Sequence, residues 1–470
     1  MSRSTAVLLL LATLVAYLTI GTAYALNTPD WQNPDEPAHY NYIKFIVEHQ
    51  ALPVLQSGDY DETYNDQFTR TPQNTHSMSI DPFRYEFYSP PLYYLLAAPI
   101  FAVTDGWLSA LRLFSVVLGG TLVVFAYRIG AELFPDRLQI AVGAAALVAF
   151  VPQHVAMMSA VNNDSLAEPL IALCIWQSIR LFKTDQPSSR SLFLLGGTLG
   201  FGLLTKQTVY YTALPIVVVA LFLHARKIQA TSDQRPARDR WSFVTSSPKR
   251  MRSGIRHLSF VFIPAIVLGG ILWLHNLYVY GGLDVLGLAR HNSIVVGQAT
   301  TAAWIDQFGL GGLLSRGFTT TFHSFWGQFG WMAVPMPDST YLLLGLLSGV
   351  ALLGWLWWLI DRRKMQVASS KLQGAILLLL LFVLTFGGFI YYNLTFVQHQ
   401  GRYLFPALIP IGLVVAIGLD HILQKIFGLI KNPNEWMAMA QMLIFAAVFI
   451  LLARLDIIAL QRYIVPFLSP

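Results

Sequence analysis

The chain begins with an uncharged apolar run, TAVLLLLATLVAYLTIGTAYALNTP at residues 5–29, and continues into WQNPDEPAHY at residues 31–40. The apolar run exceeds the roughly 20 residues that an α-helix needs to cross the hydrocarbon core of a bilayer. Ala23 and Ala25 resemble a signal-peptidase site, but the run is longer than the h-region of about 7 to 15 residues in cleaved signal peptides. We therefore expect an anchored first helix that carries the acidic pair Asp35 and Glu36 where it leaves the membrane.

Similar apolar runs recur along the 470 residues, of which 55% are hydrophobic and only 12% charged. Soluble domains carry about 25% charged residues, so this composition indicates an all-α polytopic membrane protein. We expect about eleven transmembrane helices, plus interfacial helices in the first outer loop. The expected spans are residues 5–27, 107–130, 138–160, 164–182, 190–205, 207–224, 258–280, 341–360, 372–393, 403–424 and 436–458.

The charges divide the chain into regions of opposite sign. Residues 226–257 hold nine Arg and Lys against two Asp, which gives this segment a charge of +7, more than the net +6 of the whole chain. Residues 30–88 instead hold ten acidic and three basic residues. Basic loops stay on the cytoplasmic side of a membrane. We therefore expect a multi-pass protein of the cell membrane with a cytoplasmic N-terminus and an outer C-terminus. The basic segment is most simply a cytoplasmic retention signal, with binding to anionic lipid headgroups as a secondary alternative, and its charge does not indicate nucleic acid as a partner.

Two apolar segments are consistent with this topology only if neither of them forms one transmembrane helix. Residues 90–103 are apolar for only about 14 residues, a length that suits an interfacial or re-entrant helix. Residues 191–223 are uncharged except for Lys206, and one helix over them would be about 50 Å long. We expect two short spans with a turn at Lys206.

In the acidic segment, Pro37 suits the first turn of a surface helix, whereas residues 56–80 show no periodicity and are expected to form a mobile loop.

These assignments divide the chain into three parts. Residues 1–225 form a catalytic transmembrane module with an outer loop at 28–106. Residues 226–257 form the basic cytoplasmic loop. Residues 258–470 form a C-terminal transmembrane module with an outer loop at 281–340.

Acidic residues in the outer loops are the candidates for acid–base chemistry. A hydroxyl that displaces an anionic leaving group needs one base for its proton and cations for the departing anion. Asp35, Glu36 and Asp164 are the candidate catalytic carboxylates. A structural alternative stays open, because Asp35 could cap a surface helix and Asp164 could cap the helix that it opens.

Cations on the same side are the candidates for binding the departing anion. Lys206 is the one ionisable residue in an apolar stretch, where such groups are costly and often functional, although snorkelling to the interface is the alternative. Arg402 opens a late helix at the outer surface, where the positive-inside rule does not favour it. The other candidate substrate-binding residues are His39, Arg84, His399 and Tyr403. No spacing resembles a dedicated metal site, so we expect no cofactor, with a carboxylate-bound divalent ion left open.

Three motifs resemble those of the GT-C superfamily of membrane glycosyltransferases, the group that contains protein O-mannosyltransferases and lipid A aminoarabinose transferases. They are the Asp35-Glu36 pair in the first outer loop, Pro90-Pro91-Leu92-Tyr93-Tyr94 later in that loop, and Arg402-Tyr403-Leu404-Phe405-Pro406 at the start of a late helix. The form PDEPAHY at residues 34–40 is most similar to a prokaryotic branch near that group.

The resemblance implies a polyprenyl-phosphate sugar donor, an active site at the outer membrane face and an acceptor that is a lipid, a glycan or a protein. It implies Asp35 as general base, Asp164 as the second acidic position, and Lys206 and Arg402 as ligands of the donor phosphate. A transporter or flippase of lipid-linked sugars is the alternative hypothesis, and a non-catalytic scaffold is a third. The clustering of charges on one face favours the enzyme, since a flippase also needs polar residues through the bilayer interior.

Overall fold

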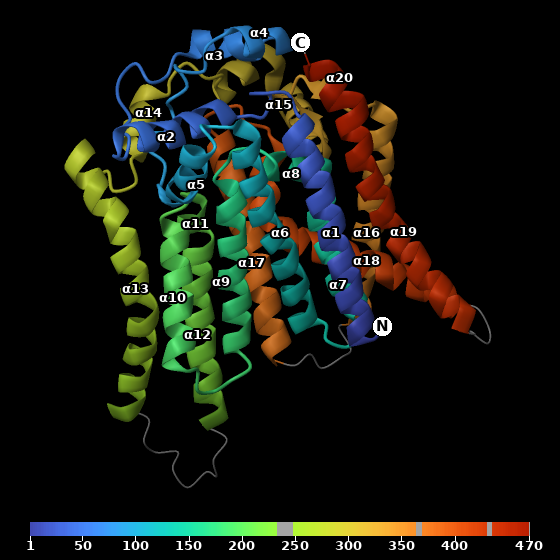
Figure 1. Ribbon diagram of the computed structural model, residues 1–470. Helices are drawn as coiled ribbons and strands as arrows, with labels where there is room; N and C mark the ends of the chain where they lie inside the picture. Colours follow the sequence, from blue (N-terminus) through green and yellow to red (C-terminus); the bar gives the residue numbers. More distant parts are fainter. Residues whose placement is uncertain (233–247, 363–368, 430–434, 470) are drawn as a thin grey trace.

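The computed structural model describes residues 1–232, 248–362, 369–429 and 435–469. Over these residues the chain is an upright bundle of helices covered at one end by shorter ones (Figure 1). The long helices of the bundle are α1 (Arg3–Asn27), α6 (Leu108–Leu133), α9 (Asp164–Leu181), α10 (Ser189–Leu203), α12 (Ala213–Ser232), α13 (Pro248–Tyr280), α16 (Asp338–Arg362), α17 (Ser369–Asn393), α18 (Leu408–Gly428) and α19 (Glu435–Ala459).

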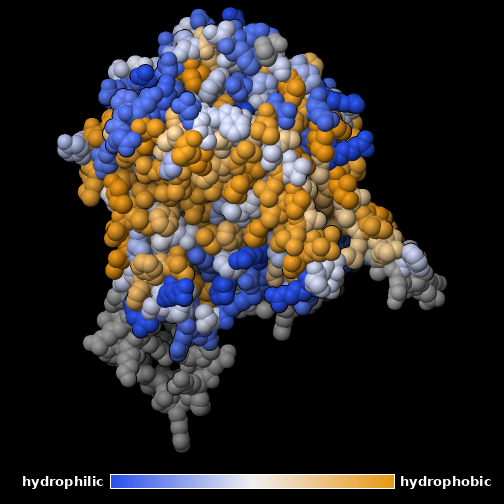
Figure 2. Space-filling model, in the orientation of Figure 1, coloured by the Kyte–Doolittle hydropathy of each residue, from blue (hydrophilic) through white to orange (hydrophobic). Residues whose placement is uncertain are grey.

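Eight helices are long and apolar enough to cross a membrane, or nine if one bent pair forms a single span. Each of the eleven apolar runs expected to span is helical in the structure, which confirms the all-α polytopic fold. The number eleven is not confirmed, because α10 has only 15 residues and α9 carries Asp164, Glu168 and Arg180 within 18 residues. Figure 2 shows the apolar band that these helices present between two polar ends.

The expected span 138–160 is not one straight helix. It consists of α7 (Leu138–Ala149) and α8 (Pro152–Met158), which are bent by 65° at the break between them. Pro152 explains the break, because proline has no N–H to continue the helix and disfavours the helical conformation in the residue before it. Val151 is accordingly extended. All seven residues of α8 are buried, so this short helix is part of the core.

The chain turns at Lys206, as expected. Helix α10 ends at Leu203 and α11 (Thr208–Tyr211) starts two residues after Lys206, before α12 continues the chain in the other direction. The Leu92 amide donates a hydrogen bond to the Leu204 carbonyl. This bond ties the turn to α5 (Leu92–Val103), the short helix that we expected to be interfacial or re-entrant.

We call the end formed by residues 30–106, 281–340 and 394–407 the cap. Its helices are α2 (Glu36–His49), α3 (Glu62–Thr69), α4 (Pro72–Ser77), α5, α14 (Leu288–Ile294), α15 (Thr301–Trp326) and the 3₁₀ helix η2 (Gly401–Ala407), with a hairpin of β1 (Gln328–Phe329) and β2 (Val334–Pro335).

The expectation of a mobile loop over residues 56–80 is wrong. Asp61 and Thr71 cap α3 and α4 through their side chains, and Phe68 packs on Phe83.

The two ends of the chain lie at opposite ends of the bundle (Figure 1). The chain closes with the π-helix η3 (Leu460–Ile464) and α20 (Val465–Leu468) beside the cap, whereas the N-terminus lies at the far end. The two expected transmembrane modules pack against each other through α10 and α13 and through α7 and α18. Much of the basic segment 226–257 lies outside the described residues, so the three-part division stays a prediction.

Candidate active site

Asp35, the residue before α2, and Arg402 of the 3₁₀ helix η2 form an ion pair. The Asp35 Oδ2 lies 2.7 Å from the Arg402 Nη1, and the Tyr85 hydroxyl donates to Oδ1 at 2.9 Å. Asp35 is the first residue before α2 and has a φ of 66°, but its side chain makes no capping hydrogen bond. The capping alternative therefore does not describe this carboxylate, which points instead at a cation far away in the sequence.

The surroundings of Asp35 keep it ionised. Burial by itself raises the pKa of this carboxyl, but the charges of Arg402 and His39 and the hydrogen bond from Tyr85 outweigh burial and hold the pKa below its ordinary value. Its side chain is 25% exposed. A partly accessible carboxylate with a depressed pKa is present as the anion at neutral pH and can accept a proton from a bound hydroxyl.

Asp164 and Lys206 form the second ion pair of the site. The Asp164 Oδ2 lies 2.7 Å from the Lys206 Nζ, and both side chains are about a quarter exposed. Asp164 is the first residue of α9, and Asn163 before it makes no side-chain cap. The lysine at the turn after α10 thus meets a carboxylate rather than extending to the interface alone.

His39 and Tyr94 connect α2, which follows Asp35, to Asn163, the residue before Asp164. The His39 Nδ1 lies 2.8 Å from the Tyr94 hydroxyl, and the Asn163 amide donates to the same hydroxyl at 3.2 Å. His39 also interacts electrostatically with Asp35, Asp164 and Lys206. Burial lowers the pKa of its imidazole, while nearby carboxylates raise it by less. Tyr94 from the Pro-Pro-Leu-Tyr-Tyr motif therefore joins α2 to the loop that carries Asp164.

Tyr403 also belongs to this group. The Arg402 guanidinium lies 5.3 Å from the centre of its ring, and the Tyr403 hydroxyl interacts with Asp35 and Lys206. We call Asp35, Arg402, Asp164, Lys206, His39 and Tyr403 the charged cluster. The cap, which includes η2, and the ends of α9 and α10 bring these six predicted residues together.

Glu36 does not share the position of its neighbour Asp35. Its side chain is fully buried, and its two oxygens accept hydrogen bonds from Arg112 Nε and Nη2 at 2.8 and 2.6 Å. The Val161 amide donates to Oε1 as well, and Arg112 also binds the carbonyls of Thr28 and Pro29. Glu36 therefore ties α1, α2 and α6 together, and the geometry does not place it with Asp35 in the charged cluster.

Arg84 and His399 lie outside the charged cluster as well. Arg84 is half-exposed, donates to the Asp81 carbonyl and lies 3.9 Å from Asp59. His399 packs edge-on against Trp304 and sits over Gly317 of α15. Neither of these two predicted substrate ligands contacts a residue of the two ion pairs in the described structure.

Sequence reasoning missed Tyr85 and Glu86, which lie next to the charged cluster. Tyr85 holds Asp35, and burial together with the Asp35 charge raises the pKa of its hydroxyl, so it stays a hydrogen-bond donor. The Glu86 charge acts on His39 and on Tyr94. The signal available in the sequence was the run Tyr85-Glu86-Phe87-Tyr88, which places an acidic residue among aromatic ones just before the Pro-Pro-Leu-Tyr-Tyr motif.

Gly401 fixes the position of Arg402. A Cβ at this position would lie 2.3 Å from the Phe325 amide nitrogen and 2.4 Å from the Thr321 carbonyl oxygen of α15. The Gly401 amide donates to the Ser324 hydroxyl at 2.8 Å. The backbone of η2 therefore rests directly on α15, and only glycine allows this approach.

We predict that Gly401→Ala destabilises the protein by about 1 to 3 kcal/mol, the usual cost of overpacking, because a Cβ there collides with the backbone of α15. Thermal unfolding in detergent would measure this effect. Gly387→Ala in α17 is the control, because nothing lies within 4 Å of a Cβ there. Equal behaviour of the two variants would contradict the assigned role of Gly401.

Among the described residues, no three His, Cys, Asp or Glu side chains converge as a metal site. The two carboxylates of the charged cluster each face a cation instead. The arrangement therefore offers two positive groups to an anionic ligand and two carboxylates to a proton or a hydroxyl.

The fold and these charges define a polytopic membrane protein with a cluster of ion pairs at one end of its bundle. The family model described as dolichyl-phosphate-mannose-protein mannosyltransferase matches residues 88–233, which include Asp164 and Lys206. An oligosaccharyltransferase of Archaeoglobus fulgidus, tethered to an acceptor peptide, shares the fold with a TM-score of 0.52 at 15% identity. That alignment covers 97% of this chain and 55% of the other, so the chain spans about half the length of that enzyme.

ArnT from Cupriavidus metallidurans, in a structure bound to undecaprenyl phosphate, aligns with a TM-score of 0.46 at 11% identity, over 99% of this chain and 74% of that one. No curated protein matches the sequence. The match to the mannosyltransferase family and the fold shared with the oligosaccharyltransferase confirm the resemblance to the GT-C superfamily that the three motifs predicted.

Proposed function

We propose that the chain is a glycosyltransferase that moves a sugar from a polyprenyl-phosphate donor to an acceptor at the outer face of the membrane, with Asp35 as the general base. One observation carries this proposal: the ion pairs Asp35–Arg402 and Asp164–Lys206 lie in one cluster, where the cap meets the ends of α9 and α10. A lipid phosphate at the membrane surface is the anion that Arg402 and Lys206 are placed to bind.

The donor phosphate would compete with the carboxylates for the two cations. Binding of the phosphate to Arg402 loosens the pair with Asp35, and the same exchange at Lys206 loosens Asp164. Asp35 then accepts the proton of the acceptor hydroxyl while the acceptor oxygen forms a bond to the anomeric carbon. The bond from that carbon to the phosphate oxygen breaks, and the lipid phosphate leaves with its negative charge held by the two cations.

Asp164 is the second carboxylate of the site. Because it contacts Lys206 directly, we propose that it holds the ammonium group in place before the donor arrives. His39 and Tyr403 complete the substrate-binding wall around Asp35. Arg84 and His399 are not part of this proposal, since neither contacts the charged cluster.

The comparisons support the donor class rather than the acceptor. The family model takes its name from an enzyme that uses dolichyl-phosphate mannose, and it covers the segment with Asp164 and Lys206. The acidic cap and the basic segment 226–257 support an outer site with a cytoplasmic N-terminus and an outer C-terminus.

Sealed vesicles that contain the purified chain and a radiolabelled polyprenyl-phosphate mannose test this function against the flippase alternative. A transferase cleaves the glycosyl–phosphate bond and yields free lipid phosphate. A flippase moves the intact lipid between leaflets without cleaving it. Translocation with no cleavage in the presence of a membrane extract as acceptor source would refute the transferase proposal.

Replacing Arg402 should change the pH dependence of the reaction in a defined direction. Since Arg402 lowers the pKa of Asp35, the carboxylate of the free enzyme stays ionised below the ordinary carboxyl pKa of about 3.9. Arg402→Gln removes this cation, so the pKa of Asp35 rises. As the pH is lowered, kcat/KM then begins to fall at a higher pH than in the unaltered protein. A pH profile of kcat/KM measures this, and an unmoved acid limb would exclude Asp35 as the titrating base.

We also propose that the reaction needs no resident metal, because Arg402 and Lys206 supply two positive charges for the phosphate. Treatment with EDTA should leave the rate of sugar transfer unchanged. Loss of activity with EDTA and its recovery with Mg²⁺ or Mn²⁺ would show that a carboxylate-bound ion takes part.

A further inference from the structure

A histidine and a glutamate in the core form a hydrogen-bonded pair that the proposed reaction does not use. The His154 Nε2 lies 3.2 Å from the Glu168 Oε2, and the two side chains are 1% and 3% exposed. His154 belongs to α8, the short helix after the break at Pro152, whereas Glu168 lies near the start of α9. Polar groups away from water are stable only when hydrogen bonds satisfy them, so the partners of this pair indicate what it does.

The break at Pro152 supplies the first partner of His154. In a continuous α-helix the amide of residue 152 would donate to the carbonyl of residue 148. Pro152 has no N–H, and the His154 Nδ1 lies 2.9 Å from the Val148 carbonyl oxygen instead. Because a carbonyl only accepts hydrogen bonds, Nδ1 carries a proton. The other ring nitrogen, Nε2, therefore faces Glu168.

One proton lies between the His154 Nε2 and the Glu168 carboxyl, and either atom can carry it. The pair is then an imidazolium with a carboxylate, or two neutral side chains, and has no net charge in either form. The Tyr17 hydroxyl of α1 also interacts with Glu168. The other charges that act on Glu168 are those of Asp164 and Lys206, which pair with each other. The pair thus adds a hydrogen bond, but no charge, next to the charged cluster.

Glu168 holds the turn of α9 that carries Asp164. The two residues are four positions apart and lie on the same face of the helix. Pro169 follows inside α9 and has no N–H for the carbonyl four residues back, so the first turn has fewer bonds to the rest of the helix. The bond from Glu168 to α8 replaces this connection. The position of Asp164, and of Lys206 at 2.7 Å from it, therefore depends on Glu168.

His154 also supports the short helix that carries Arg402. The centre of its ring lies 5.1 Å from that of Phe405 in η2, with the two planes at 83°. Side chains three residues apart lie on the same side of a 3₁₀ helix, so Phe405 and Arg402 share one side of η2. Phe325 of α15 packs on Phe405 as well, at 5.6 Å between ring centres. The imidazole therefore contacts elements that carry both ion pairs of the charged cluster.

We infer that His154 and Glu168 are positioning residues of the transferase, which fix α9 and η2 and thereby the two cations that bind the donor phosphate. This inference rests on the proposed function. The two side chains are buried and have no access to a substrate, so neither is a catalytic residue. The inference also gives the bend at Pro152 a role, because the bend turns an imidazole toward both elements.

Variants of Glu168 in lipid nanodiscs test the inference by two measurements. These are the affinity for a polyprenyl phosphate and the release of lipid phosphate from labelled polyprenyl-phosphate mannose, with a membrane extract as acceptor source. Glu168→Gln keeps a donor for Nε2 and should keep both. Glu168→Met has a similar length but no polar group. It should weaken binding about tenfold, the loss of one charge-assisted hydrogen bond, and slow transfer about 100-fold, the effect of a 1 Å displacement.

Two further variants separate positioning from folding. Gln177→Met is the matched control, because Gln177 lies further along α9 and donates to Thr198 at 3.3 Å; it should bind and transfer normally. His154→Phe combined with Glu168→Met removes both buried polar groups and keeps a ring beside Phe405. This double variant should unfold near the temperature of the unaltered protein but still transfer slowly.

Three results would overturn the inference. Full transfer by the double variant would reduce the pair to a contribution to folding. Full binding and transfer by Glu168→Met would show that the hydrogen bond positions nothing. Loss of transfer by folded Glu168→Gln would make the carboxyl itself part of the chemistry.

Failure of the proposed function gives a different result. An unaltered protein that binds polyprenyl phosphate but never cleaves the donor removes the transferase, whereas weaker binding by Glu168→Met still supports the positioning role. Equal cleavage by the unaltered protein and by Glu168→Met removes the positioning role alone. A folded, unaltered protein that binds no polyprenyl phosphate removes both.

Discussion

Asp35→Asn is expected to lower the rate of sugar transfer by about 10²- to 10⁴-fold, the range that general base catalysis contributes. The asparagine side chain has nearly the same shape but cannot take the acceptor proton. Because Arg402 and Lys206 remain, binding of the polyprenyl phosphate should be retained. The measurement is release of lipid phosphate from a labelled donor, together with donor affinity in the same nanodisc preparation.

Asp66→Asn is the matched control for this prediction. Asp66 belongs to the same cap but lies exposed on α3, so its amide variant should transfer sugar at the unaltered rate. If Asp35→Asn kept full activity, Asp35 would not be the base. If it lost donor binding instead, its role would be to build the site rather than to move a proton.

Glu36→Gln is expected to act on folding rather than on chemistry. The Glu36–Arg112 pair has no exposed surface on either side chain, and removal of one partner from such a pair costs about 3 to 5 kcal/mol because the other charge stays buried. The measurements are thermal unfolding and yield of folded protein in detergent. Glu36→Leu combined with Arg112→Met should recover part of the loss, since it removes both charges together.

Asp30→Asn is the control for this pair. Asp30 lies 4.0 Å from Arg112, but its side chain is 63% exposed, and exposed pairs contribute about 0 to 1 kcal/mol. A Glu36→Gln variant that folds normally but has lost transfer would contradict our assignment and would return Glu36 to the catalytic residues.

The transmembrane part of the fold could be predicted because its cause is local. An apolar run of sufficient length must form a helix in lipid, where every backbone polar group needs a partner. The turn at Lys206 also followed from length alone. The break at Pro152 was missed because a proline is tolerated within many membrane helices. The size of the bend between α7 and α8, 65°, depends on how α8 packs in the core and could not be read from the sequence.

The sequence predicted the six residues of the charged cluster but also named Glu36, Arg84 and His399, which lie outside it, and it did not predict which residues would pair. Composition and topology placed Asp35, Asp164, Lys206 and Arg402 on one side of the membrane, but contacts between distant segments depend on packing. The sequence did not distinguish the roles of the neighbours Asp35 and Glu36. In the structure their side chains point in different directions: the left-handed backbone at Asp35 directs its side chain to η2, whereas Glu36, within the first turn of α2, faces α6.

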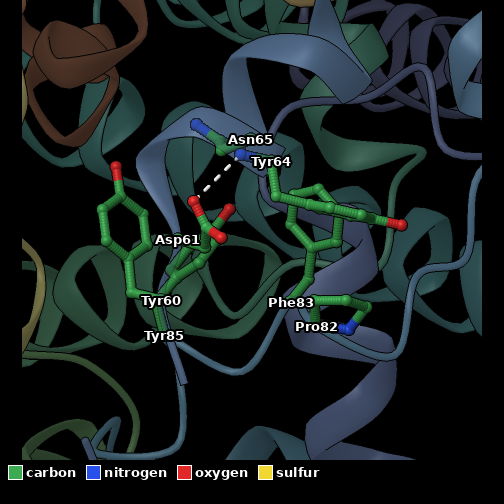
Figure 3. A pocket seen from close by; sticks show the side chains of 7 residues that line it. All are labelled: Tyr60, Asp61, Tyr64, Asn65, Pro82, Phe83 and Tyr85. Carbon is green, nitrogen blue, oxygen red and sulfur yellow. Dashed lines mark hydrogen bonds between the residues drawn. The ribbon is translucent and has the colours of Figure 1, made fainter. Parts of the chain in front are cut away.

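The small pocket that Tyr60, Tyr64 and Tyr85 line in the cap (Figure 3) could not be predicted for a similar reason. Tyr60 and Tyr64 lie in the segment 56–80, which shows no helical periodicity, so nothing in the sequence indicated that α3 would form beside residues 82–85. The capping carboxylate of Asp61 starts this helix and is at the same time a wall of the pocket.

The most direct test of the central claim is a structure of the full chain bound to a polyprenyl phosphate. We expect the phosphate between Arg402 and Lys206, with oxygens about 2.7 to 2.9 Å from their nitrogens, and the Asp35–Arg402 contact lengthened. A phosphate bound elsewhere, with both ion pairs of the charged cluster unchanged, would contradict the account.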